Sequence, residues 1–121
     1  MNTIKILLLE DEISLGKSYE KRLTKEGFQI KWVQNSQEFK KQLLQEPVDI
    51  IILDHGLKQD THSGIELIPL VKKYAPNSQC IILSNYSQFQ LEQEVLQAGA
   101  DSYLLKINYS PKKLAEYLRN L

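Results

Sequence analysis

The sequence predicts an α/β fold in which five parallel strands form a doubly wound sheet. Short runs rich in Ile, Leu and Val alternate along the chain with longer segments whose apolar residues have helical spacing. This alternation is the pattern of repeated βα units, and five such units fit the 121 residues. Because crossovers between parallel strands are right-handed, we expect helices to cover both faces of the sheet.

The predicted strands are apolar runs bounded by polar or turn-forming residues. Runs of this kind are typical of strands that are buried on both faces of a parallel sheet. In chain order, the expected strands are Thr3–Leu9, Phe28–Val33, Val48–Leu53, Gln79–Ser84 and Ser102–Leu105.

Each predicted helix follows its strand and carries apolar residues three or four positions apart. Ser14 and Ser36 are the predicted N-caps of the first two helices, because a serine hydroxyl can accept a hydrogen bond from the first helical turn. The fourth helix is mostly polar, so we expect it to be marginally stable. In chain order, the expected helices run from Ser14 to about Gly27, from Ser36 to Pro47, from Gly64 to Tyr74, from Ser87 to Ala98, and from Pro111 to Leu121.

Composition excludes several classes of protein. With 121 residues, of which 42% are hydrophobic, the chain fits one compact domain spanning residues 1–121. Fifteen basic residues balance fifteen acidic ones, so direct binding to nucleic acid is not expected. The one cysteine, Cys80, lies within an apolar run and suits a reducing compartment. No apolar run is long enough for a membrane span, and we expect a soluble cytoplasmic protein.

Four of the predicted strands end at residues that phosphoryl chemistry could use. These residues are Glu10 with Asp11, then Asp54, then Ser84, then Lys106. In an open parallel sheet, ligands bind in the crevice beyond the carboxyl ends of the strands. We therefore expect all of these groups to meet at one edge of the sheet.

The three carboxylates at this edge predict a cation site. Two carboxylates about 4 Å apart repel each other by roughly 4 kcal/mol at an effective dielectric constant of about 20. Either a proton or a cation must relieve that repulsion. Hard oxygen ligands on a partly solvated edge favour Mg²⁺. Asp54 would then be a nucleophile that forms an acyl phosphate, with Lys106 and Ser84 beside the phosphoryl group.

These motifs resemble the receiver domain of bacterial response regulators, and the resemblance covers almost the whole chain. It implies a flavodoxin-like (βα)5 fold with strand order 2-1-3-4-5. The segments that carry it are Leu8-Leu9-Glu10-Asp11-Glu12, Ile51-Ile52-Leu53-Asp54, Gly64, Ile82-Leu83-Ser84 and Gly99-Ala100-Asp101-Ser102-Tyr103-Leu104-Leu105-Lys106.

The resemblance implies a site and its cofactor. Asp54 is similar to the aspartate that accepts a phosphoryl group from a histidine kinase or a histidine phosphotransfer protein. Glu10 and Asp11 resemble the acidic pair that binds Mg²⁺, with Asp54 and the backbone carbonyl of Gly56 as the remaining protein ligands. The implied protein is not an enzyme in the usual sense, since it catalyses only its own phosphorylation and dephosphorylation.

The resemblance also implies how the signal leaves the site. Ser84 resembles the switch hydroxyl, Tyr103 the aromatic switch, and Lys106 the lysine that pairs with the phosphoryl group. The implied output is a conformational shift of the face formed by helix four, strand five and helix five. The partner that recognises the shifted face would be a downstream protein or an attached output domain. By the same analogy, a homodimer through the last two helices is an open alternative.

Two departures from the family pattern keep a second function open. Ile107 follows Lys106 where the family usually has a proline in a cis bond, and Asn85 stands where the family usually has a small residue. The alternative is a degenerate receiver that binds a partner without phosphorylation. A third reading, an aspartate-nucleophile hydrolase of the haloacid dehalogenase type, needs a second acid two residues after Asp54. That position is Gly56, so this reading is set aside.

Overall fold

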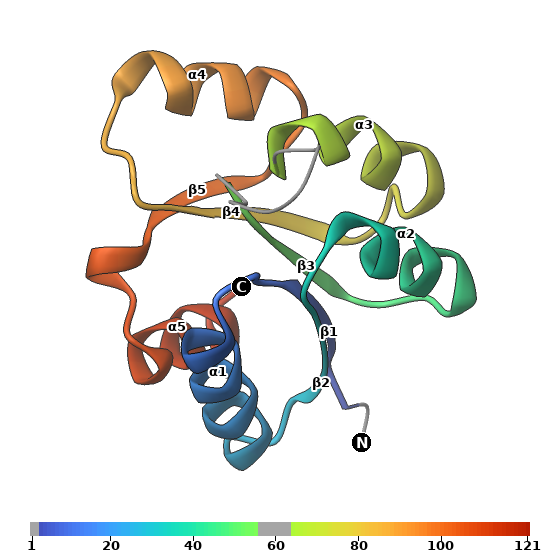
Figure 1. The fold of residues 1–121 in the computed structure, drawn as a ribbon, viewed down its shortest axis with the longest axis vertical. Coiled ribbons are helices and arrows are strands. Elements are labelled where there is room, and N and C mark those ends of the chain that lie inside the picture. The colour runs from blue at the N-terminus through green and yellow to red at the C-terminus, as the bar shows by residue number, and fades with distance from the viewer. Residues whose placement is uncertain (1–2, 56–63) are drawn as a thin grey trace.

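The computed structural model describes residues 3–55 and 64–121, which form alternating strands and helices (Figure 1). The strands are β1 Lys5–Leu9, β2 Gln29–Val33, β3 Ile50–Asp54, β4 Gln79–Ser84 and β5 Ser102–Leu105. The α-helices are α1 Ile13–Lys25, α2 Ser36–Gln45, α3 Gly64–Tyr74, α4 Phe89–Gln97 and α5 Pro111–Arg119. A short 3₁₀ helix, η1, spans Lys106–Asn108.

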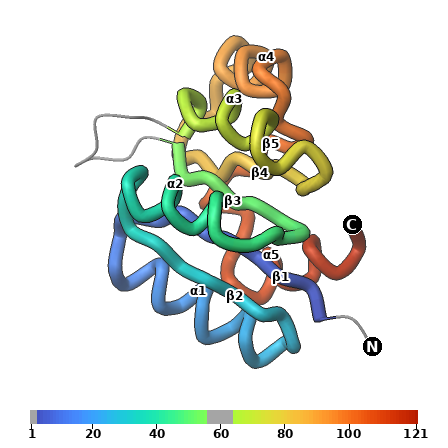
Figure 2. The backbone as a smooth tube through the Cα atoms, turned by 90° about the vertical axis from the view of Figure 1, so that its right-hand side faces the viewer, coloured from blue at the N-terminus to red at the C-terminus, as the bar shows by residue number. Residues whose placement is uncertain are grey.

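The five strands form one parallel sheet in the order β2-β1-β3-β4-β5. Figure 2 shows this order, from β2 at the bottom to β5 near the top. The central strand β3 is buried along its whole length, whereas the edge strand β2 is mostly exposed or half-buried. The burial of β3 is what its continuous apolar run predicts for a strand with helices on both sides. The predicted fold class and strand order are confirmed.

Alternate residues of the strands supply two separate cores, one on each face of the sheet. Leu7 and Leu9 of β1 belong to the core under α2, α3 and α4, whereas Ile6 and Leu8 belong to the core under α1 and α5. Figure 1 shows α1 and α5 together on one side of the sheet and the other three helices on the opposite side. This follows from the two-residue period of side chains along a strand.

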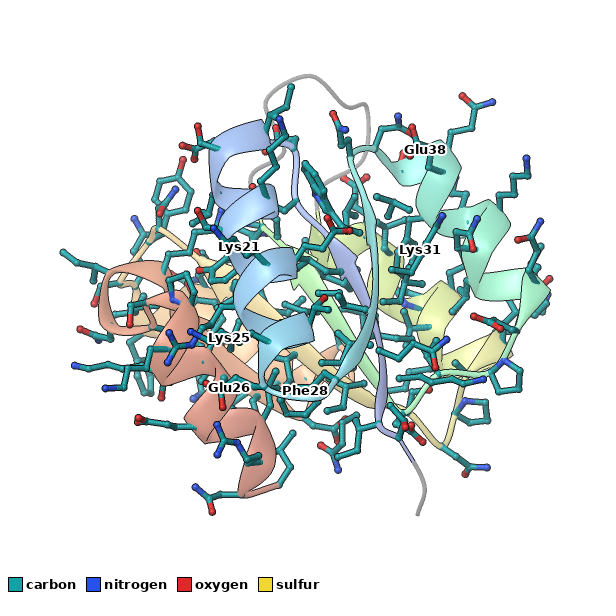
Figure 3. The ribbon with its side chains drawn as sticks, turned by 90° about the horizontal axis from the view of Figure 1, so that it is seen from below. Lys21, Lys25, Glu26, Phe28, Lys31 and Glu38 are labelled. Atoms are coloured by element: carbon teal, nitrogen blue, oxygen red, sulfur yellow. The ribbon has the colours of Figure 1, made fainter. Side chains whose placement is uncertain are left out.

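Helices α1 and α5 are joined by polar contacts at their ends as well as by the core. Figure 3 shows Glu26 just after α1, on the side where α5 lies. Arg22 Nε lies 3.1 Å from Glu26 Oε2, and Arg119 of α5 pairs with the other oxygen of the same carboxylate. In the core beneath, the Tyr19 hydroxyl donates a 3.2 Å hydrogen bond to the carbonyl of Tyr109. The two helices therefore form one layer.

The predicted helix starts are wrong at two places. Glu12, not Ser14, is the extended residue before α1, and its side chain makes no capping hydrogen bond. Asn35, not Ser36, caps α2, since its side-chain oxygen accepts a 2.8 Å hydrogen bond from the amide of Glu38. In both cases the residue nearer the preceding strand has the extended backbone that the N-cap position requires.

Other predicted boundaries agree to within one or two residues, and α3, β4 and β5 match. The fourth helix is shorter than predicted, beginning at Phe89 rather than Ser87, and Val95 is its one fully buried residue. At the start of α5, the Ser110 side chain accepts a hydrogen bond from the amide of Lys113. None of the helices within the described ranges is long and apolar enough to cross a membrane.

Candidate functional site

Strand register brings the predicted site residues to one edge of the sheet. Leu9 pairs with Leu53, Asp54 pairs with Leu83, and Ser84 pairs with Leu105. The residue that follows or ends each of β1, β3, β4 and β5 is therefore one of the predicted site residues. Glu10 extends the ladder by one step, because its amide donates a 3.0 Å hydrogen bond to the carbonyl of Val33.

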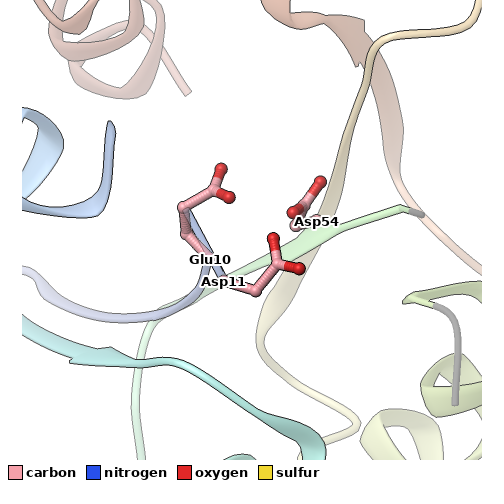
Figure 4. Close-up of side chains that lie close together, drawn as sticks. All are labelled: Glu10, Asp11 and Asp54. Atoms are coloured by element: carbon pink, nitrogen blue, oxygen red, sulfur yellow. The ribbon is translucent and has the colours of Figure 1, made fainter. Parts of the chain in front are cut away.

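Three carboxylates converge at this edge. Glu10, Asp11 and Asp54 each offer an oxygen, and these oxygens all lie within 4.8 Å of one another. Figure 4 shows the side chains of Glu10 and Asp11 beside Asp54, which stands at the end of β3. Glu10 and Asp54 are buried, and Asp11 is the most exposed of the three. Asp11 is therefore the member of the cluster that is most accessible to solvent.

Lys106 supplies a positive charge to the cluster. Its ammonium nitrogen lies 2.7 Å from Asp54 Oδ1 and 2.8 Å from Glu10 Oε1, and its side chain is 9% exposed. Burial lowers the pKa of Lys106, but the hydrogen bonds and charges of Asp54 and Glu10 outweigh burial and raise its pKa overall. Lys106 therefore stays protonated, and its ammonium group is held between the two carboxylates.

Asp54 is held in an environment that disfavours its charge. Burial, and then the neighbouring negative charge of Glu10, raise the pKa of Asp54 to about 8, against the opposing effect of Lys106. One ammonium group thus does not compensate for two buried carboxylates at this edge. A further cation near Asp54 would favour its ionised form.

The backbone around the site is tightly packed on the β3 side. Gly64, the first residue of α3, lies so close to β3 that a Cβ there would be 2.6 Å from the carbonyl oxygen of Asp54. A larger residue would push α3 away from the strand that carries Asp54. Gly56, whose carbonyl is the predicted fourth ligand, lies outside the described residues.

Ser84 and Tyr103 are connected through Tyr86, a residue that belongs to none of the sequence motifs. Ser84 Oγ accepts a 3.0 Å hydrogen bond from the amide of Tyr86, and the Tyr103 hydroxyl donates to the carbonyl of Tyr86. The Tyr86 ring also meets the ring of His55 edge to face, with centroids 6.2 Å apart. The residue after Asp54 and the two candidate switch residues therefore all contact one residue of the β4–α4 loop.

The two departures from the family pattern both lie on the surface. Asn85 is exposed, and Ile107 is 90% exposed in η1. Among the described residues no peptide bond is cis. Lys106 reaches both carboxylates with a trans bond after it, so a proline at position 107 is not needed for that contact.

A second unpredicted contact holds the loop between β1 and α1. The indole Nε1 of Trp32 donates a 2.9 Å hydrogen bond to the carbonyl of Glu10, and Glu10 Oε2 accepts one of 3.1 Å from the amide of Glu12. Trp32 is also packed against the core under α1 and α5. No local pattern reveals a contact between residues 22 positions apart.

The donor set fits a hard divalent cation. All three side chains offer carboxylate oxygens, and the partly exposed Asp11 leaves room for the water molecules that Mg²⁺ retains. A softer metal would favour sulfur or imidazole ligands. The one cysteine of the chain, Cys80, is fully buried within β4, and so it offers no sulfur ligand to this cluster.

Comparisons with known proteins agree with this arrangement. The sequence profile of the response regulator receiver domain matches residues 6–119. The transcriptional regulatory protein QseB of Haemophilus influenzae is 30% identical over 118 residues, which are 98% of this chain and 51% of that protein. The chain spans 22% of the length of the NtrX-like response regulator of Rickettsia felis and about half of the length of QseB.

Solved structures share the fold. A CheY-like receiver domain protein from Methanospirillum hungatei superposes with a TM-score of 0.88 at 24% identity, covering 98% of this chain and 93% of that one. A response regulator from Burkholderia pseudomallei, solved with a phosphorylated aspartic acid, a calcium ion and citrate, has a TM-score of 0.80 at 21% identity. That match covers 97% of this chain and 71% of the other.

The profile match spans nearly the whole chain, and the parallel sheet places an acidic cluster and a lysine at its carboxyl edge. The chain therefore belongs to the response regulator receiver domain family of two-component signalling systems.

Proposed function

We propose that residues 1–121 act as one receiver unit that accepts a phosphoryl group on Asp54 in the presence of Mg²⁺. The observation that carries the proposal is the cluster of Glu10, Asp11 and Asp54 oxygens within 4.8 Å, with Lys106 Nζ 2.7 Å from Asp54. The phosphorylated aspartic acid and bound calcium ion of the Burkholderia pseudomallei regulator support it. We infer that the protein acts in the cytoplasm.

Three carboxylates would hold the cation: Glu10, Asp11 and Asp54. When bound, Mg²⁺ supplies positive charge that favours ionised Asp54 and neutralises phosphoryl oxygens. The carboxylate oxygen of Asp54 then forms a bond to phosphorus. The bond between phosphorus and the histidine nitrogen of the donor breaks, and its electron pair leaves with that nitrogen. The donor is a histidine kinase or a histidine phosphotransfer protein.

Lys106 serves as the fixed counter-charge throughout the transfer. Its ammonium group already contacts Asp54 and Glu10, and its raised pKa keeps it protonated at neutral pH. A new phosphoryl group on Asp54 would present oxygens within reach of the same ammonium. Lys106 therefore stabilises the product without a change in its own charge.

Ser84 and Tyr103 would transmit the change to the α4–β5–α5 face. A phosphoryl group on Asp54 offers new acceptors to the Ser84 hydroxyl, which now accepts from the amide of Tyr86. Since Tyr103 bonds to the carbonyl of Tyr86, movement of this loop reaches β5 directly. A downstream protein or an attached output domain would read the new population of states.

The test is the intact mass of the protein after incubation with acetyl phosphate or phosphoramidate and Mg²⁺. We expect a gain of one phosphoryl group in the wild type and none in Asp54→Asn. Lys106→Ala should be phosphorylated more slowly or hold the group for a shorter time. Chelation of Mg²⁺ should abolish the gain in the wild type.

One outcome would favour the alternative function. If folded wild-type protein gains no mass with either donor, the phosphorylation proposal is wrong. The chain would then be a degenerate receiver that recognises a partner without phosphorylation.

A further inference from the structure

We propose that Trp32 is a positioning residue for the metal site, acting through the backbone of Glu10. This inference rests on the proposed Mg²⁺ site and adds a residue that lies on β2, a strand that contributes no ligand. The carbonyl that accepts from the Trp32 indole belongs to the peptide plane joining Glu10 to Asp11. One hydrogen bond therefore orients the backbone of both candidate ligands.

The end of β2 explains why an indole is needed at this position. The ladder between β1 and β2 ends at Leu9 and Val33, and the Glu10 amide adds one last bond to the Val33 carbonyl. Glu10 is 0% exposed, so its own carbonyl has no access to water. A buried carbonyl requires a donor, and the Trp32 indole supplies it.

Gly16 of α1 provides the space for this contact. A Cβ on Gly16 would lie 2.1 Å from the six-membered ring of Trp32, so any side chain there would displace the indole. Glycine inside a helix costs about 1 kcal/mol relative to alanine. The close approach to Trp32 gives a physical reason for glycine at this helical position.

Strand geometry explains how a β2 side chain reaches α1. Figure 3 shows Lys31 on the side of β2 nearer α2. Because side chains alternate along a strand, the next residue, Trp32, faces α1 and packs against the core under α1 and α5. Its indole then lies between Gly16 on the helix and the β1–α1 loop that carries the two acids.

The single tryptophan of the chain allows a sharp test. The protein is produced in a tryptophan auxotroph supplied with β-(3-benzothienyl)alanine. In this chain the analogue enters at Trp32 alone, where it replaces the indole N–H by sulfur and preserves the ring shape. The probe is Mn²⁺, whose free and bound forms are distinguished by electron paramagnetic resonance, with Mg²⁺ as competitor. We expect the dissociation constant to rise about tenfold, the low end of the roughly 10- to 100-fold loss that follows removal of a group that orients a metal ligand.

Three variants test the same contact, and a fourth serves as the control for its specificity. Trp32→Phe removes the N–H, and Gly16→Ala displaces the ring, so both should weaken Mn²⁺ binding in the same way. The double variant should be no weaker than Trp32→Phe, because both changes break one contact. Ser78→Ala is the control, since it removes a 2.6 Å side-chain hydrogen bond to the Val48 carbonyl at the opposite edge of the sheet. Its metal affinity should stay within about twofold of the wild type.

The outcomes separate this inference from the proposed function. Wild-type affinity in the folded benzothienylalanine protein would show that Trp32 only packs, and would overturn the inference while leaving the metal site intact. If the folded wild type binds neither Mn²⁺ nor Mg²⁺, the proposed site itself is wrong and the inference fails with it. Urea unfolding of each variant verifies that it is folded.

Discussion

Lys106 is the residue whose loss the site should tolerate least. It is the ammonium partner of both Glu10 and Asp54, and all three side chains are at least nine-tenths buried. Removing one partner from a buried ionic cluster leaves charge without compensation, which costs several kcal/mol. Because the pKa of Asp54 is about 8, one negative charge is shared by Glu10 and Asp54 at pH 7, and without Lys106 that charge would be buried with no counter-charge.

We predict that Lys106→Ala lowers the free energy of unfolding by about 3 kcal/mol at pH 7 without Mg²⁺. The matched control is Lys72→Ala, because Lys72 Nζ lies 3.8 Å from Asp101 and both side chains are more than a third exposed. That exposed pair should contribute less than about 1 kcal/mol. Urea unfolding measures both. Equal losses of unfolding free energy in the two variants would mean that Glu10 and Asp54 are neutralised in another way.

At the scale of elements, helix starts show what sequence patterns miss. Serine in front of an apolar run predicted caps at Ser14 and Ser36, but a cap also needs an extended backbone. Asn35 has that backbone, with φ −148° and ψ 166°, whereas Ser36 is already helical. The side-chain amide of Asn35 also donates to Glu38 Oε1 at 3.1 Å, so a second contact joins the same two residues.

We expect Asn35→Ala to destabilise the protein by about 1 kcal/mol through loss of this cap. Ser14→Ala should change the free energy of unfolding by less than about 0.5 kcal/mol, because Ser14 is an exposed residue within α1. Chemical unfolding of the two variants under one condition provides the comparison. A larger effect at Ser14 than at Asn35 would restore the original assignment of the cap.

At the scale of the whole molecule, the fold was largely predictable, and so was the meeting of the site residues. Parallel strands with polar residues at their carboxyl ends bring Glu10, Asp54, Ser84 and Lys106 to one edge whatever the details of packing. The contacts of Trp32 and Tyr86 could not be predicted, because they depend on side-chain packing between distant segments. Local sequence patterns indicate the periodicity of helices and strands, but they do not indicate which distant side chains will contact each other.

Burial of proton-binding groups also makes global stability depend on pH. Burial raises the pKa of Cys80 from 9.0 to about 12, and the pKa of Tyr19 from 10.0 to about 12. Above pH 9 the unfolded chain loses the Cys80 proton while the folded protein retains it. The stability contributed by this group is therefore complete below pH 9 and is lost as the pH rises toward 12.

We predict that the wild type loses about 2 kcal/mol more stability between pH 9 and pH 11 than Cys80→Ala does. Urea unfolding at several pH values measures the difference, and each variant serves as its own reference at pH 8. Parallel pH profiles for the two proteins would show that the Cys80 thiol ionises equally well in the folded state.

The pairing of α1 with α5 has a consequence for synthesis on the ribosome. The Tyr19 hydroxyl contacts a carbonyl 90 positions later, and Glu26 pairs with an arginine 93 positions later. The surface of α1 that packs against α5 therefore emerges from the ribosome long before α5 does. In the same way, Glu10 is translated long before Lys106, its partner in an ion pair. The acidic cluster is therefore completed only after β5 and the lysine that follows it have been translated.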